Sequence, residues 1–202
     1  PGFVNEAKEM GLKLLLPDVN ESGARFVPTA DSKGIRYGLG GIKGVGAAAA
    51  EAIVTERRAN GPYKGVLDFC MRLAHLSVVN KRVLENLSRV GAFSTIEPNR
   101  AKVFNNIEFV IKRSQQRAKE KASAQTDFFG LMAGGEETYD DSELVDSPPF
   151  SPAEELKYER DLMGVYISGD PLESCKRLIS ELSVVKVDAP DAPVMPFSFA
   201  MI

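Results

Sequence analysis

The run Ile42-Lys43-Gly44-Val45-Gly46 holds the residues of this chain best suited to binding chemistry, because its two glycines can leave backbone amides open. A short apolar segment precedes the run, and an alanine-rich segment, 47–58, follows it at once. Glycine accepts a positive φ without strain and lets another backbone approach closely. Amides at the start of a helix carry partial positive charge and suit an anion. The pattern predicts a helix-hairpin-helix that binds the DNA backbone without reading sequence.

Each residue of this hairpin has an expected role. Gly44 and Gly46 would lie against a phosphate, Lys43 would add charge at the tip, and Val45 would pack beneath. Binding of this kind is electrostatic and weakens steeply with salt. The competing interpretation is a plain tight turn between two helices. Exposed Arg57 and Arg58 on the following helix favour DNA.

A second turn follows the segment 80–89, whose Val83, Leu84 and Leu87 are spaced as the buried face of a helix. We interpret Val90-Gly91-Ala92-Phe93, where that segment ends, as a second, degenerate hairpin. The two turns together predict a DNA-binding set. Its members are Lys43, Gly44, Val45, Gly46, Arg57, Arg58, Lys81, Arg82, Arg89 and Gly91.

The segment Gln125-Thr126-Asp127-Phe128-Phe129 has the form of a short linear motif. A glutamine can hydrogen-bond at the mouth of a pocket while two aromatic rings fill it. The residues predicted to bind a partner protein are Gln125, Asp127, Phe128 and Phe129. The alternative is that both rings fold back onto their own domain.

Charge is unevenly distributed along this chain of 202 residues, whose net charge is −3. Between residues 71 and 121 eleven lysines and arginines face four glutamates, whereas between 136 and 161 ten carboxylates face two cations. The acidic C-terminal part therefore makes the net charge negative, although the middle of the chain is basic and suits nucleic-acid binding. The alternative is that these cations are only a solvated helix face.

Composition narrows the class of protein. Two distant cysteines, Cys70 and Cys175, and the single histidine His75 argue against a structural zinc site and suit a reducing compartment. No apolar run approaches membrane length and the first residues lack the charged and apolar regions of a signal peptide, so we expect no membrane partner. The chain starts without methionine, which predicts a piece of a longer protein.

The predicted fold is mainly α. It is a tandem helix-hairpin-helix domain with a small mixed α/β N-terminal segment and a partly disordered C-terminal extension. We expect short strands near 12–16, 25–27 and 35–37, in a segment too small for its own core that belongs to a neighbouring domain. The expected helices are 5–10, 47–58, 66–73, 80–89, 99–122, 152–163 and one ending near 182. Ser151 and Glu154 form a capping box at the start of 152–163.

Several segments in order resemble the bacterial C-family replicative polymerases, the DNA polymerase III α subunits, in the region after their catalytic core. The resemblance covers about residues 3–182. Asp170 stands where that family has histidine, and Leu16 where it has proline. The matching segments are 16–20, 35–46, 69–70, 80–85, 91–93, 125–129 and 162–172.

The resemblance implies four parts. Residues 1–37 would be the end of the fingers region, and 38–122 the tandem helix-hairpin-helix domain that holds duplex DNA. Residues 123–150 would be a flexible linker whose 125–129 bind the β sliding clamp. Residues 151–202 would be a connecting helix and the start of a truncated OB domain.

The resemblance also implies that the parent is a DNA-directed DNA polymerase of the bacterial cytoplasm, with Mg²⁺ in a palm domain upstream. No carboxylate cluster here could replace that palm for two-metal chemistry, so we expect the fragment to be inactive and to need no cofactor. The implied partners are duplex DNA, the β clamp and other subunits of the polymerase III holoenzyme.

Two other classes of function stay open. A repair glycosylase would carry a catalytic Asp or Lys soon after its hairpin, yet the next acidic residue beyond 47–58 is Asp68, in a predicted core helix. A protein-binding scaffold without DNA affinity would instead turn its basic face to acidic partners. A salt titration of duplex binding separates this scaffold from a DNA-binding domain.

Overall fold

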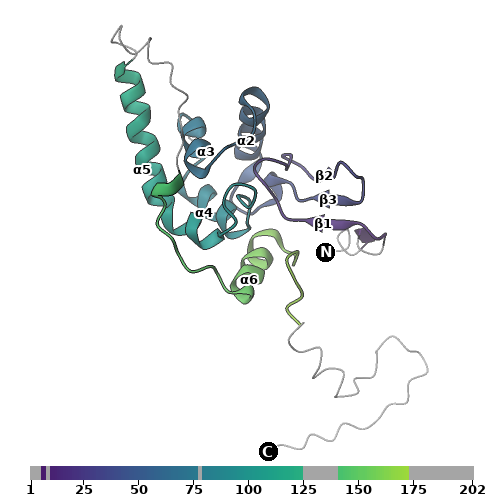
Figure 1. Ribbon diagram of the computed structural model, residues 1–202. Coiled ribbons are helices and arrows are strands. Elements are labelled where there is room, and N and C mark those ends of the chain that lie inside the picture. Colours follow the sequence, from purple (N-terminus) through teal and green to yellow (C-terminus); the bar gives the residue numbers. More distant parts are fainter. Residues whose placement is uncertain (1–5, 8–9, 77–78, 125–140, 173–202) are drawn as a thin grey trace, which may run out of the picture. The chain divides into compact units, whose positions relative to one another are not determined.

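The computed structural model describes residues 6–7, 10–76, 79–124 and 141–172 (Figure 1). The chain divides into two compact units, residues 1–169 and 170–202, and all the described helices and strands lie in the first. That unit is mainly helical with one small sheet, which confirms the predicted fold class. The C-terminal extension, including the helix expected to end near 182, lies outside the described residues. No helix in the described ranges is long and apolar enough to cross a membrane.

The sheet contains three short strands near the N-terminus, as the sequence predicts. They are β1 (Lys13–Leu15), β2 (Val27–Pro28) and β3 (Gly34–Arg36), in the order β1-β3-β2. β3 pairs parallel with β1, placing Leu14 opposite Ile35, and antiparallel with β2. Of the helix expected over 5–10, the described residues 6 and 7 are helical.

Five α-helices follow the sheet in the described part of the chain. They are α2 (Gly46–Asn60), α3 (Val66–Leu73), α4 (Lys81–Arg89), α5 (Arg100–Ala124) and α6 (Pro152–Met163), with short 3₁₀ turns η1 (Leu39–Gly41) and η3 (Asp141–Glu143). The predicted ranges 66–73 and 152–163 agree residue for residue. The capping box is also present, since the Ser151 and Glu154 side chains accept from each other's amide.

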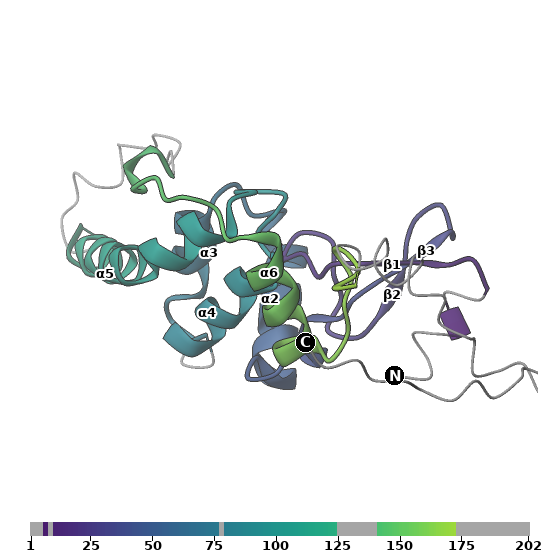
Figure 2. The ribbon, with the colours of Figure 1, turned by 90° about the horizontal axis from the view of Figure 1, so that it is seen from below.

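The core forms where α5 packs on both α3 and α4, and α2 packs on α3 and adds buried residues to it. Phe69, Leu87 and Phe93 are fully buried there, and the Phe69 and Phe93 rings meet edge to face with centroids 5.1 Å apart. Figures 1 and 2 show α6 beside α4, on which it packs although the two helices are far apart in the chain.

The N-terminal segment packs into the helical unit. Val19 is fully buried and its amide donates to the carbonyl of Ala92 at 2.8 Å. The Asn20 side chain accepts from the Tyr63 amide at 2.7 Å and donates to the Tyr63 carbonyl at 2.9 Å. The buried Asp18 carboxylate accepts from the amide and hydroxyl of Thr95. Residues 18–20 therefore complete this unit, although the short strands led us to assign them to a neighbouring domain.

Part of the predicted flexible linker, residues 141–150, is packed against the helices, so that prediction is wrong there. The Asp141 carboxylate accepts from the amides of Val66 and Leu67, at 2.7 and 3.1 Å, and so caps α3. Leu144 is buried, and Val145 exchanges two hydrogen bonds with the Asn106 side chain. The composition of the segment could not predict these contacts, because each joins residues far apart in sequence.

Candidate nucleic-acid interface

The first glycine turn is open to solvent. Gly44 and Gly46 have φ of +83° and +76°, and both are exposed. Val45 is buried between them, as predicted, and its amide donates to the Ile42 carbonyl at 3.1 Å. A side chain added at Gly46 would meet nothing within 4 Å. The element before the turn is the single 3₁₀ turn η1 rather than a full helix.

The start of α2 differs from the other helix starts. Asn80, Asn99 and Ser151 place a side-chain oxygen on the first amides of α4, α5 and α6, and Asp141 does so for α3. No side-chain oxygen in the described part of the chain accepts from the first amides of α2. Since such amides attract negative charge, α2 offers an open anion site beside the Gly44–Gly46 turn.

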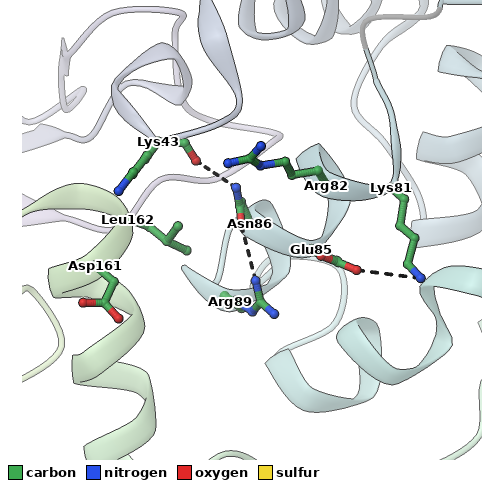
Figure 3. Close-up of a pocket in the computed structure, with 8 residues that line it drawn as sticks. All are labelled: Lys43, Lys81, Arg82, Glu85, Asn86, Arg89, Asp161 and Leu162. Carbon is green, nitrogen blue, oxygen red and sulfur yellow. Dashed lines mark hydrogen bonds and ion pairs between the residues drawn. The ribbon is translucent and has the colours of Figure 1, made fainter.

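An open cavity of about 660 Å³ adjoins this turn (Figure 3). Most of its lining comes from the hairpin and from α4, with two residues from α6. Four of the predicted DNA-binding cations meet there. The lining residues are Lys43, Lys81, Arg82, Glu85, Asn86, Arg89, Asp161 and Leu162.

Asn86 ties the hairpin to α4. Its side-chain amide donates to the Lys43 carbonyl at 2.8 Å, and an added Cβ on Gly44 would lie only 2.6 Å from that amide nitrogen. The same hypothetical Cβ would lie 3.5 Å from Nε of Arg82, so the Arg82 side chain runs beside the turn. Sequence reasoning missed Asn86, whose only signal was a polar residue on the buried face of 80–89.

The four cavity cations differ in their partners. Lys81 is bound to Glu108 at 2.6 Å, and this hydrogen bond raises the Lys81 pKa. Arg89 is partly buried against aromatic rings. The side chains of Lys43 and Arg82 are exposed and form no ion pair within the described ranges. These two are the charges most available to an anion.

Arg57 and Arg58 lie away from this cavity, near the C-terminal end of α2. Gly46 starts the same helix, so about 17 Å of helix separates the arginines from the turn. Arg57 donates to the Val19 carbonyl at 2.7 Å and holds the N-terminal segment. The structure therefore does not bring these two predicted residues together with the hairpin.

The second glycine turn is closed. Gly91 has a φ of +75° and is buried, and the amides of Gly91 and Ala92 donate to Ser88 and Leu87 at the end of α4. This is the pattern of a glycine that ends a helix. A Cβ on Gly91 would lie 2.7 Å from Nε of Arg100, which covers the turn. The structure gives Gly91 a role in ending α4, and phosphate binding there stays a prediction.

Arg100 and Glu159 form a buried ion pair that sequence reasoning missed. Glu159 is fully buried, lies 3.2 Å from Nη1 of Arg100, and accepts from the amides of Ile167 and Ser168. Its position in an acidic stretch gave no signal of burial.

The basic middle of the chain is also less free than its composition indicates. Among the described side chains of 71–121, five cations pair with carboxylates: Arg72, Lys81, Arg100, Lys102 and Arg113.

The predicted partner-binding residues Gln125, Asp127, Phe128 and Phe129 lie outside the described residues.

Burial raises the pKa of the Cys70 thiol to about 12, so that group is a core residue and not a nucleophile. Among the residues with described side chains, no three His, Cys, Asp or Glu gather as a metal site.

Comparison with known proteins places this chain in a family. A family model described as "Helix-hairpin-helix motif" matches residues 11–103. The DNA polymerase III subunit alpha of Neisseria meningitidis serogroup B is 38% identical over 186 residues, or 92% of this chain. That of Haemophilus influenzae is 37% identical over 184 residues, and that of Chlamydia trachomatis 38% over 187.

The match covers most of this chain but only a small part of each relative. The chain spans about 16% of the length of the Neisseria protein and 15% of the other two. Over nine-tenths of its own length, this chain belongs to the DNA polymerase III alpha subunits, as one segment of them.

Proposed function

We propose that this segment holds duplex DNA by its phosphate backbone, with the Gly44–Gly46 turn as the contact. The observation that carries the proposal is the combination at one place of uncapped helix amides and unpaired cations. The first amides of α2 have no side-chain acceptor among the described residues, and Lys43 and Arg82 stand beside them. A phosphate diester supplies the missing acceptor and the missing negative charge.

Each group has a distinct part in this proposal. The amides that follow Gly46 donate to phosphate oxygens, Lys43 and Arg82 neutralise the same or the next phosphate, and Val45 anchors the turn in the core. None of these groups reads a base edge, so the binding is independent of sequence.

We further propose that the whole protein is a DNA-directed DNA polymerase and that residues 125–129 bind its sliding clamp. The named relatives support the first part. The second rests on the resemblance of Gln125-Thr126-Asp127-Phe128-Phe129 to a clamp motif. The segment would then hold the polymerase to its template in two ways, by DNA backbone contacts and through the clamp.

A pair of glycine substitutions tests DNA binding by the hairpin. Gly46→Ala places a side chain where phosphate would lie, and Gly61→Ala is the matched control at the far end of α2. Both glycines have positive φ, +76° and +80°, and open space around them, so both substitutions strain the backbone without a clash. Fluorescence anisotropy with a duplex of arbitrary sequence should show about tenfold weaker binding for Gly46→Ala only. Equal losses in both variants would refute the assignment of the site.

Clamp binding has its own test. Replacing Phe128 and Phe129 with alanine removes the two rings that would fill the clamp pocket, and should abolish binding in a pull-down with the β clamp. Duplex affinity should not change, because the hairpin is untouched. Normal clamp binding by this variant would show that the motif assignment is wrong.

A further inference from the structure

The Arg89 guanidinium lies against two aromatic rings from different helices. Its guanidinium carbon lies 4.6 Å from the centre of the Phe104 ring on α5 and 5.5 Å from that of Tyr158 on α6. Phe150 packs on both rings, with centroids 6.0 Å from Phe104 and 5.2 Å from Tyr158. A guanidinium in this position is attracted by the ring faces and loses most of its conformational freedom.

Asn86, which is hydrogen-bonded to the hairpin, contacts the same guanidinium. The Asn86 side chain donates to the Lys43 carbonyl at 2.8 Å, which turns its amide oxygen toward Arg89, whose Nη1 lies 3.5 Å away. Arg89 has no carboxylate partner within the described ranges, and its buried Nε has no hydrogen-bond partner there. Arg89 is therefore a fixed positive charge, without a counter-ion among the described residues, at the wall of the cavity beside the hairpin.

The helix that carries Tyr158 is itself anchored to both glycine turns. The Leu162 carbonyl of α6 accepts from the amide of Lys43 at 2.9 Å, in the first turn. Glu159 of α6 pairs with Arg100, which covers Gly91 in the second. These contacts fix the position of α6 on α4, and with it the position of the Tyr158 ring.

We propose that Tyr158 is a positioning residue for phosphate binding by Arg89, so that α6 completes the DNA interface although it lies outside the matched motif at residues 11–103. The proposal rests on the proposed function, since it assumes that the hairpin binds DNA. A fixed guanidinium binds phosphate better than a mobile one because less side-chain entropy is lost on binding. The Tyr158 ring holds the Arg89 side chain in place without a carboxylate. A carboxylate would compete with the phosphate for the guanidinium.

The test combines Tyr158→Leu, Tyr158→Phe, Arg89→Ala and the double variant Arg89→Ala/Tyr158→Leu in duplex binding at several salt concentrations. Tyr158→Leu should weaken binding about three- to fivefold, because a cation–π contact of this kind is lost. Tyr158→Phe keeps the ring and should bind as the wild type does. Arg89→Ala should lower the slope of log affinity against log salt by about 0.9, the value for one phosphate contact. Adding Tyr158→Leu to Arg89→Ala should cause no further loss.

Several results would overturn this inference while leaving the proposed function intact. These are wild-type affinity in Tyr158→Leu, a loss in Tyr158→Phe equal to that in Tyr158→Leu, or additive losses in the double variant. A wild-type protein that fails to bind DNA would instead refute the proposed function, and the inference with it. NMR separates the structural part, because the ring currents should shift the Arg89 δ-protons further upfield in the wild type and in Tyr158→Phe than in Tyr158→Leu, where only the Phe104 ring remains beside the guanidinium.

Discussion

The two glycine turns of this molecule share a backbone conformation and differ in almost everything else. Gly46 starts a helix whose first amides have no side-chain partner among the described residues, and the space around it is open. Gly91 ends a helix, its amide is already bonded, and Arg100 covers it. A glycine turn is therefore a candidate phosphate site only when its amides and its surface are free.

The charges around the two turns follow the same division. Beside the first turn Lys43 and Arg82 have no ion pair within the described ranges, whereas Arg100 beside the second is paired with the buried Glu159. We infer that the first turn binds DNA and that the second holds the scaffold together. Substitutions at the second should change stability and those at the first should change binding.

The largest effect should come from Glu159→Ala. This change leaves Arg100 buried, at 7% exposure, without its main counter-charge. Loss of one partner from a buried ion pair costs about 3–5 kcal/mol. Urea denaturation should show a loss of this size. Glu155→Ala, which removes a more exposed and more distant partner of Arg100, is the control and should cost less than about 1 kcal/mol. Equal small losses would mean that the ion pair does not hold the second turn.

A smaller loss is expected from Gly91→Ala. The positive φ of Gly91 costs an L-residue about 1–2 kcal/mol, and contact with Arg100 adds to that. Thermal denaturation should show this loss, while duplex affinity of the folded protein stays within about twofold of wild type. A fall in affinity as large as that of Gly46→Ala would make the second turn a DNA contact after all and would break the comparison.

Ala47→Glu should have the smallest effect on stability. It should stabilise the fold slightly but weaken duplex binding. Ala47 is exposed in the first turn of α2, where a carboxylate stabilises a helix by about 0.3–1 kcal/mol. The same carboxylate would occupy the anion site, so duplex affinity should fall about three- to tenfold. Ala153→Glu makes the same change in the first turn of α6 and should stabilise without weakening binding. Equal weakening in both variants would point to overall charge rather than to the site.

Local signals explain what the sequence predicted well. Asn80 and Ser151 cap α4 and α6 by accepting from amides three residues further on, and the glycines at 61 and 164 end α2 and α6. Such signals operate within one turn of helix and can be read without knowing the fold. The hairpin, with exposed Gly44 and Gly46 and buried Val45, was predicted for the same reason.

Contacts between distant residues explain what sequence reasoning missed. Asp141 caps α3 from 75 residues away, and Glu159 reaches Arg100 across 59. Neither aspartate nor glutamate carries a local mark that separates a buried partner from a solvated charge. The basic middle was overestimated for this reason, because pairing of Lys102 and Arg113 with Asp146 and Glu143 depends on how the chain folds back.

DNA binding by the first turn is tested most directly by the salt dependence of duplex binding in two charge-matched double variants. Lys43→Gln/Arg82→Gln removes two exposed cations beside the first turn that have no ion pair within the described ranges, and Lys33→Gln/Lys64→Gln removes two exposed lysines that do not line the cavity. We predict that the slope of log affinity against log salt falls by about two in the first variant and stays at the wild-type value in the second. Equal slopes in the two variants would contradict the claim that the Gly44–Gly46 turn is where this segment binds DNA.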